Sequence, residues 1–264
     1  MTRRVKATIL GCGPSGGVPT IHDGWGACDP KNPKNRRLRP SILVEEGDVR
    51  VLVDTSPDLR QQLLDTGVRR LDAVLYTHAH ADHLHGVDDL RSINRAMQAA
   101  LPVYADAATE AILKRRFEYV TTPLADGAEI YYKPVLELRR IVPGDRFSVG
   151  AMEIQAYDQD HGFSRTIGYR FGPLAYSTDL LELPEASFRA LAGVDTWIVG
   201  AFALQPHVTH AHVDKALGWI ERVRPARAVL THLGPTIDHG RLSASLPNNV
   251  VAAFDGLVVE AAGE

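Results

Sequence analysis

Residues 72–83 read DAVLYTHAHADH, and this short run carries the strongest structural signal in the chain. Its first five residues are mainly apolar, which predicts a short buried strand. The residues after them put four possible metal ligands within six positions: His78, His80, Asp82 and His83. Imidazole suits Zn, Mn, Fe or Ni, and a carboxylate adds charge that can hold a second divalent ion. The run therefore predicts a metal-binding turn, which we favour over a turn whose histidines merely cap a helix.

Three more ligand-type residues stand at the ends of other predicted strands. His161 follows MEIQAYD, Asp179 ends LAYSTD and His232 ends RAVLTH. Loops at strand ends are where sites are assembled on rigid scaffolds, although each residue alone also has an ordinary structural explanation. The complete set divides between two ions, with His78, His80 and His161 on one, Asp82, His83 and His232 on the other, and Asp179 bridging them.

Strands and helices alternate through both halves of the chain. Residues 22–40 form the longest polar stretch, which predicts a surface loop. Strands are predicted at 5–10, 41–45, 49–53 and in the successive apolar runs of 136–171, and helices from Ser56 and at 88–99, 107–119, 184–191 and 212–222. Because the chain has no short repeat, low-complexity tract or linker, one layered domain over 1–264 is the simplest organisation.

The composition is that of an ordinary globular protein. The 264 residues are 45% apolar and 23% charged, with a formal net charge of -3. Proteins that bind polyanions without specificity usually carry a clear basic excess, so this class is disfavoured. The two cysteines, Cys12 and Cys28, do not suggest a disulfide scaffold, which favours a reduced, cytoplasmic protein. No stretch is long and apolar enough to predict a membrane span.

The H-x-H-x-D-H motif at 78–83, with the later His161, Asp179 and His232, resembles the metallo-β-lactamase-fold hydrolases. The resemblance covers nearly the whole chain. It implies an α/β fold of four layers, an αβ/βα sandwich in which two mixed sheets are flanked by helices. It also implies two divalent metal ions, Zn²⁺ or Mn²⁺. Asp54, in VLVDTSPD, matches an aspartate of the family, and we expect it to orient a ligand histidine or a bound water.

Two further segments resemble one branch of that family. Residues 11–19 follow the pattern G-x-G-x-x-x-G-V-P, and residues 36–41 read RRLRPS. The branch holds the phosphoribosyl cyclic phosphodiesterase (PhnP-like) and, more distantly, the tRNA 3′-end-processing ribonuclease. Asp179 fits this branch, since classical β-lactamases carry a cysteine there. The resemblance implies a phosphodiesterase that acts on a small cyclic phosphate or a nucleotide phosphodiester.

Two other hydrolase activities stay open. A tRNA 3′-processing endonuclease is less favoured, because the usual long substrate arm is not obvious and the chain is mildly acidic. A thioester hydrolase of the glyoxalase II type is compatible with the same metal site. Diiron flavoproteins are disfavoured, because they need an acidic residue where Ala79 and His80 stand and a flavin domain as well.

The expected partner is a small phosphorylated substrate or nucleotide, and RNA is a less favoured one. No binding to a membrane is expected, and a homodimer is left open.

The expected mechanism needs a nucleophile and a proton donor. Two ions about 3.5–4 Å apart share a water and lower its pKa, which yields a hydroxide for in-line attack. The resemblance implies a histidine that protonates the leaving group, and AHVDKAL favours His212, with His210 as the second choice. A histidine that only caps the following helix is the ordinary alternative for His212. Asp82 is expected to accept a proton from the attacking water as well as to bind metal.

The N-terminal loop departs from the cyclic phosphodiesterase. That enzyme holds a structural zinc with three cysteines and a histidine, whereas this chain has Cys28 alone, with Asp23, Trp25 and Pro235 at the other positions. We therefore expect no zinc there, and a loop ordered by its prolines and Trp25.

Basic residues and glycines in the same region each allow two interpretations. The basic residues either steer a phosphorylated substrate or lie in solvent, and they are Lys31, Lys34, Arg36, Arg37 and Arg39. The glycine turn from Gly11 to Gly17 either binds an anion through backbone N–H groups or simply closes a tight turn, which we favour.

Overall fold

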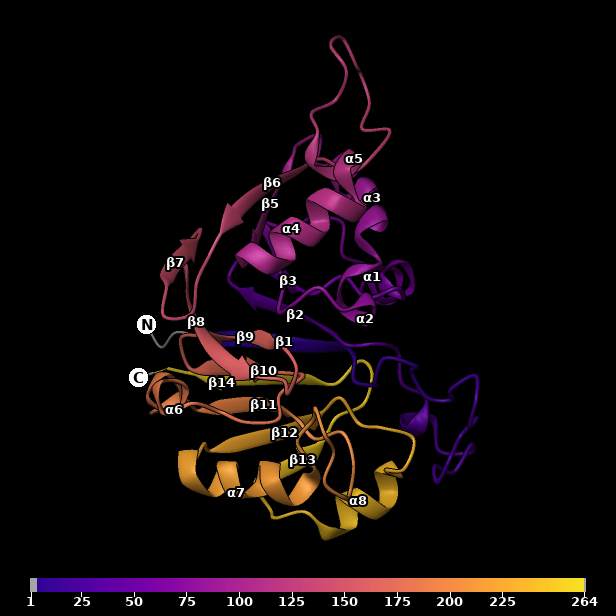
Figure 1. Cartoon of the computed structure of the whole chain (residues 1–264), viewed down its shortest axis with the longest axis vertical. Coiled ribbons are helices and arrows are strands. Elements are labelled where there is room, and N and C mark those ends of the chain that lie inside the picture. The colour runs from indigo at the N-terminus through magenta and orange to yellow at the C-terminus, as the bar shows by residue number, and fades with distance from the viewer. Residues whose placement is uncertain (1–3, 264) are drawn as a thin grey trace.

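Two seven-stranded sheets face each other and carry helices on their outer sides (Figure 1). The computed structural model describes residues 4–263. The four layers run helices, sheet, sheet, helices, which confirms the predicted fold class. None of the helices within the described range has the length and apolarity that crossing a bilayer requires.

The first sheet is antiparallel from β14 to β3 and parallel from β3 to β6. In spatial order its strands are β14 (Val258–Ala262), β1 (Arg4–Gly11), β2 (Ser41–Glu46), β3 (Val49–Val53), β4 (Ala73–Leu75), β5 (Leu101–Ala105) and β6 (Leu136–Arg140). The helical segments of this half are η1 (Pro33–Asn35), α1 (Leu59–Thr66), α2 (Ala81–Leu84), η2 (Val87–Asp89), α3 (Leu90–Met97), α4 (Ala107–Arg116) and α5 (Glu118–Thr121).

The second sheet is parallel from β13 to β10 and antiparallel from β10 to β7. Its strands are β13 (Val250–Ala252), β12 (Arg227–Thr231), β11 (Thr196–Gly200), β10 (Leu174–Ser177), β9 (Arg165–Phe171), β8 (Met152–Asp160) and β7 (Arg146–Val149). The helices of this half are α6 (Glu185–Leu191), α7 (Val213–Val223) and α8 (His239–Ser245).

Three apolar clusters hold the layers together. Alternate strand residues point to opposite faces, so each sheet supplies one face to the centre and the other to its helices. Ile9 of β1 and Tyr169 of β9 belong to the central cluster between the sheets. Leu52 of β3 shares an outer cluster with helix residues of the first half. Trp197 of β11 does the same in the second half. The rigid sheets thereby fix the loops at their strand ends.

Most of the predicted elements are present, with shifted ends. The helix expected at 88–99 is η2 followed by α3, and the helix expected at 107–119 is α4 followed by α5. The helix expected at 212–222 is α7, which begins at Val213 and has His212 as its N-cap. Beyond His232 the structure has α8, β13 and β14, which are not predicted from the sequence.

A buried arginine fastens the long N-terminal loop. The Arg37 side chain is 1% exposed, and its guanidinium donates hydrogen bonds to three backbone carbonyls of the segment after β12. These are Leu233 O at 3.1 Å, Gly234 O at 3.1 Å and Ile237 O at 2.8 Å. Cys28 Sγ also donates to Ile237 O, at 3.2 Å. Arg37 is therefore a structural residue of this loop.

Other basic residues of the loop are engaged as well. Arg39 makes a two-point contact with the Asp58 carboxylate, at 2.8 and 2.6 Å. Arg36 lies over the Trp25 ring, 5.2 Å from its centroid, and Lys34 over an aromatic ring near the C-terminus. Hydrogen bonds from Arg37 and an ion pair from Arg39 thus hold the loop, and Trp25, one of its predicted sources of order, contributes its contact with Arg36.

Close backbone packing explains the glycines at 11–17. A Cβ on Gly11 would lie 2.0 Å from Arg39 O, and one on Gly13 would lie 2.8 Å from Leu38 O. Gly13 N also donates to Leu38 O at 2.8 Å. The interpretation as a tight turn against the loop accounts for these glycines.

We expect Arg37→Met to lower the free energy of unfolding by about 3 kcal/mol, because it removes three buried hydrogen bonds from a charged donor and leaves Leu233 O without one. Urea denaturation followed by circular dichroism measures the change. Arg36→Met is the matched control, since Arg36 is exposed, and its effect should stay within about 0.5 kcal/mol. Equal losses in the two variants would contradict the structural role of Arg37.

Candidate metal centre

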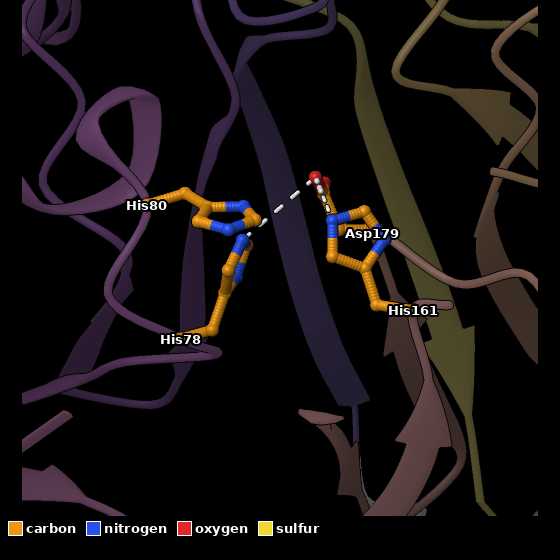
Figure 2. Close-up of side chains that lie close together, drawn as sticks. All are labelled: His78, His80, His161 and Asp179. Carbon is orange, nitrogen blue, oxygen red and sulfur yellow. Dashed lines mark ion pairs between the residues drawn. The ribbon is translucent and has the colours of Figure 1, made fainter. Parts of the chain in front are cut away.

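The ends of several strands from both sheets meet at one place. His78 and His80 lie between β4 and α2, on the first half of the molecule. His161 directly follows β8, and Asp179 lies two residues after β10, on the second half. Figure 2 shows these four side chains pointing toward one another across the gap between the two halves. One atom from each lies within 4.8 Å of the others.

A second group shares Asp179. The ligand atoms of His83, Asp179 and His232 also lie within 4.8 Å of one another. Asp82 is adjacent, with Oδ2 at 3.3 Å from His83 Nε2. The structure thus gathers at one place all seven side chains predicted as ligands. Four form the first group, His83 and His232 join Asp179 in the second, and Asp82 lies beside His83.

Asp179 lies between the two groups, and each of its oxygens faces one of them. Oδ1 is 3.1 Å from His83 Nε2 and 3.3 Å from His232 Nδ1. Oδ2 is 3.8 Å from His78 Nε2 and 3.7 Å from His161 Nε2, the pairs drawn as dashed lines in Figure 2. This is the geometry of a carboxylate that can bridge two cations.

Left-handed backbone turns aim three of the site's side chains. Asp54, Asp179 and His232 have φ values of 64°, 49° and 57°, just after β3, β10 and β12. Such a conformation is uncommon for residues other than glycine and costs about 1–3 kcal/mol in strain. The turn ends the strand abruptly, so that the side chain is directed into the site.

Hydrogen bonds fix the outer sides of the histidine rings. Asp54 is fully buried, and its Oδ2 lies 2.6 Å from His83 Nδ1. The same carboxylate accepts from Thr77 N and Thr77 Oγ1, both at 2.8 Å. His161 Nδ1 donates to Thr209 O at 2.8 Å. In both rings the outer nitrogen carries the proton, which leaves Nε2 free to face the site.

Burial and charge shift the pKa values of the cluster in opposite directions. Burial alone lowers the pKa of His83, but the carboxylates of Asp179 and Asp82 outweigh it and raise this pKa well above its usual value. Burial raises the pKa of Asp179, yet His232 and His83 hold it well below its usual range. Burial lowers the pKa of His78 well below 6.5 and that of His232 to about 4.

Two observations fit this donor set to divalent cations. Within residues 4–263, no lysine or arginine forms an ion pair with the buried carboxylates of Asp54, Asp82 or Asp179, so their charge lacks a permanent cationic partner. In addition, His78 Nε2 and His232 Nδ1 are buried without any hydrogen-bond partner. His83 Nε2 lies near carboxylates, but without hydrogen-bond geometry. Unpaired buried ring nitrogens beside uncompensated carboxylates are what a metal site requires.

His210, and not His212, lies at this cluster. His210 Nε2 is 3.3 Å from Asp179 Oδ2, and its ring stacks on that of His232 with centroids 5.1 Å apart. The bond from Ala211 N to Leu180 O, at 2.6 Å, holds this stretch of chain beside Asp179.

The choice of His212 from the sequence does not fit the geometry. His212 is the N-cap of α7 and makes no side-chain cap bond. No hydrogen bond, ion pair or ring contact joins its side chain to the cluster within the described part of the chain. His210, the second choice, is the histidine that the fold brings to the site.

The sequence analysis also gave no role to two neighbours of His210. Thr209 Oγ1 lies 2.8 Å from His210 Nδ1 and 3.2 Å from His207 Nδ1. Since Thr209 N donates to His207 Nδ1, that nitrogen is an acceptor, and the hydroxyl can accept from His210 and donate to His207. The only sequence signal was the density of histidines in 207–212.

Comparisons with known proteins agree with this architecture. Residues 49–233 match the family model described as the Beta-lactamase superfamily domain. A solved structure of a diphosphatase from the PhnP family is 34% identical, with a TM-score of 0.90 and 99% of each chain covered.

Two curated relatives match over part of their length. An octanoyltransferase from Porphyromonas gingivalis is 30% identical over 96% of this chain and 51% of that protein. A ribonuclease Z from Bradyrhizobium sp. is 32% identical over 53% of this chain and 46% of that protein. The match thus spans only about half the length of either relative. Because the family model spans strands of both sheets and the PhnP-family structure matches over 99% of each chain, this chain belongs to the beta-lactamase superfamily and has the metallo-β-lactamase fold.

Proposed function

We propose that the chain hydrolyses a small phosphodiester with the help of two divalent cations. The observation that supports this proposal most directly is the position of Asp179, whose two carboxylate oxygens each face a separate group of histidines. A single ion would need only one of these groups. The relatives named diphosphatase and ribonuclease Z support phosphate chemistry, because both names describe enzymes that cut bonds to phosphate.

The two cations would be held as the sequence analysis divided them. The bridging carboxylate of Asp179 would contact both, with the remaining six ligands being His78, His80 and His161 for one ion and Asp82, His83 and His232 for the other. When bound, such a pair of ions binds a phosphate oxygen and activates water for in-line attack. Asp54 keeps the His83 ring in the orientation that this role needs.

We assign protonation of the leaving group to His210. Its side chain is 17% exposed, so the ring borders both the cluster and the solvent from which a substrate enters. Nε2 faces the site, and a proton there can pass to a departing alkoxide. Thr209 Oγ1 holds the opposite ring nitrogen and fixes the ring plane. His207 Nδ1 continues the chain of hydrogen bonds toward the surface.

We expect chelation to abolish hydrolysis of bis(p-nitrophenyl) phosphate, and Zn²⁺ or Mn²⁺ to restore it, because the nucleophile depends on bound cations. Metal analysis of the purified protein should give about two ions per chain. Asp179→Ala should lower that content, since it removes the shared ligand, whereas Asp126→Ala on an exposed loop should not. Full metal content in Asp179→Ala would contradict the bridging role.

Substituting His210 should slow hydrolysis in a way that depends on the leaving group. For an alkoxide, as in a 2′,3′-cyclic nucleotide, His210→Ala should lose about 10²–10⁴-fold in kcat, because an alkoxide needs a proton to depart. The loss should be much smaller with p-nitrophenolate, which is a good leaving group. Metal content should not change.

His212→Ala is the matched comparison and should behave like the wild type on both substrates. If His212→Ala instead shows the leaving-group dependence, the assignment of the proton donor is wrong. A thioester and pre-tRNA belong in the same assay panel. Activity confined to the thioester would overturn the phosphodiester proposal while leaving the metal centre intact.

A further inference from the structure

Large apolar side chains stand in solvent on the two loops that border the metal centre. Phe163 is 90% exposed, Val208 is 70% exposed and Leu204 is 48% exposed. Exposed apolar residues scattered singly over a surface need no explanation. These three are not scattered, because they lie on the loops after β8 and β11, which also carry His161 and His210.

The two loops form one connected rim. His161 N donates to Ser164 O at 2.9 Å, which closes a tight turn with Phe163 at its tip. Gly162, with φ of 78°, allows this turn to lie directly against the second loop, since a Cβ there would be 2.8 Å from Val208 O. His161 Nδ1 ties the loops together through Thr209 O, at 2.8 Å.

An aromatic ring continues this apolar surface inward. The Phe202 ring lies 4.8 Å from the ring of His210 and 6.1 Å from that of His232, measured between centroids. It also contacts the His207 ring at 4.8 Å. Phe202 thus places an aromatic ring at the edge of the cluster, on the same loop that carries Leu204 and Val208.

We propose that this rim, defined by Phe163, Leu204 and Val208, is an apolar subsite for the group esterified to the substrate phosphate. The proposal rests on the phosphodiesterase function proposed above. A substrate whose phosphate binds at the metal centre beside His210 lies next to the loops that carry His161 and His210. An aromatic or alkyl group there would remove apolar surface from water on both partners, whereas a bare sugar would leave it exposed. The inferred substrate class is an organic phosphodiester with one apolar ester group.

The test compares two substrates whose leaving alkoxides are similarly basic, the ethyl and the hexyl ester of thymidine 3′-phosphate, because the departing group lies beside His210 and the rim. We expect the wild-type enzyme to favour the hexyl ester about tenfold in kcat/KM, mainly through KM. In Phe163→Ser and in Val208→Ser this preference should fall toward unity. Val142→Ser, in the exposed turn between β6 and β7, is the control and should keep the preference.

The outcomes separate this inference from the function on which it rests. A wild-type enzyme that hydrolyses both esters equally well overturns the apolar subsite and leaves the phosphodiesterase proposal standing. An enzyme that hydrolyses neither ester, even with metal added, overturns the function itself. Analytical sedimentation of the same variants measures their oligomeric state and tests whether the rim is instead a contact between subunits. If Phe163→Ser dissociates a dimer without changing the ester preference, the rim is a subunit contact and the inference is wrong.

Discussion

The site depends on the charge balance of three buried carboxylates. Asp54, Asp82 and Asp179 have no lysine or arginine partner among the described residues, and their nearest polar neighbours include histidines. Buried charge is costly unless it is compensated, and without metal the compensation falls to histidines such as His83, whose pKa the carboxylates raise. Divalent cations satisfy the carboxylates and the unpaired ring nitrogens together. The same requirement explains why Asp179 lies between the two histidine groups, where one carboxylate can serve two cations.

The fold makes such a concentration of charge feasible because two rigid sheets support it. Each contributing strand is packed on both faces, so the energetic cost of the strained residues after β3, β10 and β12 can be borne by the apolar clusters beneath them. No single element carries the site. His78 and His83 come from one half of the molecule, and His161 and His232 from the other, so docking of the two halves and assembly of the site are one event.

The structure brings the predicted ligand residues together, and each of them is marked locally in the sequence. A motif of four ligand types in six residues, and polar residues that directly follow apolar strands, can be recognised without knowing how the chain packs. The choice between His210 and His212 could not be made this way. It depends on the path of the chain between β11 and α7, which is set by contacts such as the one from Ala211 to Leu180. The role of Arg37 could not be predicted from the sequence either, because nothing in this polar, basic loop distinguishes its buried guanidinium from those of its exposed neighbours.

The arginine that fastens the N-terminal loop differs in kind from a structural metal. Its hydrogen bonds end on the carbonyls of Leu233 and Gly234, directly after His232. These hydrogen bonds do not depend on a supply of zinc. A chelator cannot remove a guanidinium, which belongs to the chain and stays charged. Under the two-cation proposal, loss of metal would empty the centre without removing the hydrogen bonds that fasten this loop. The loop next to the site therefore depends for its anchorage on the chain alone.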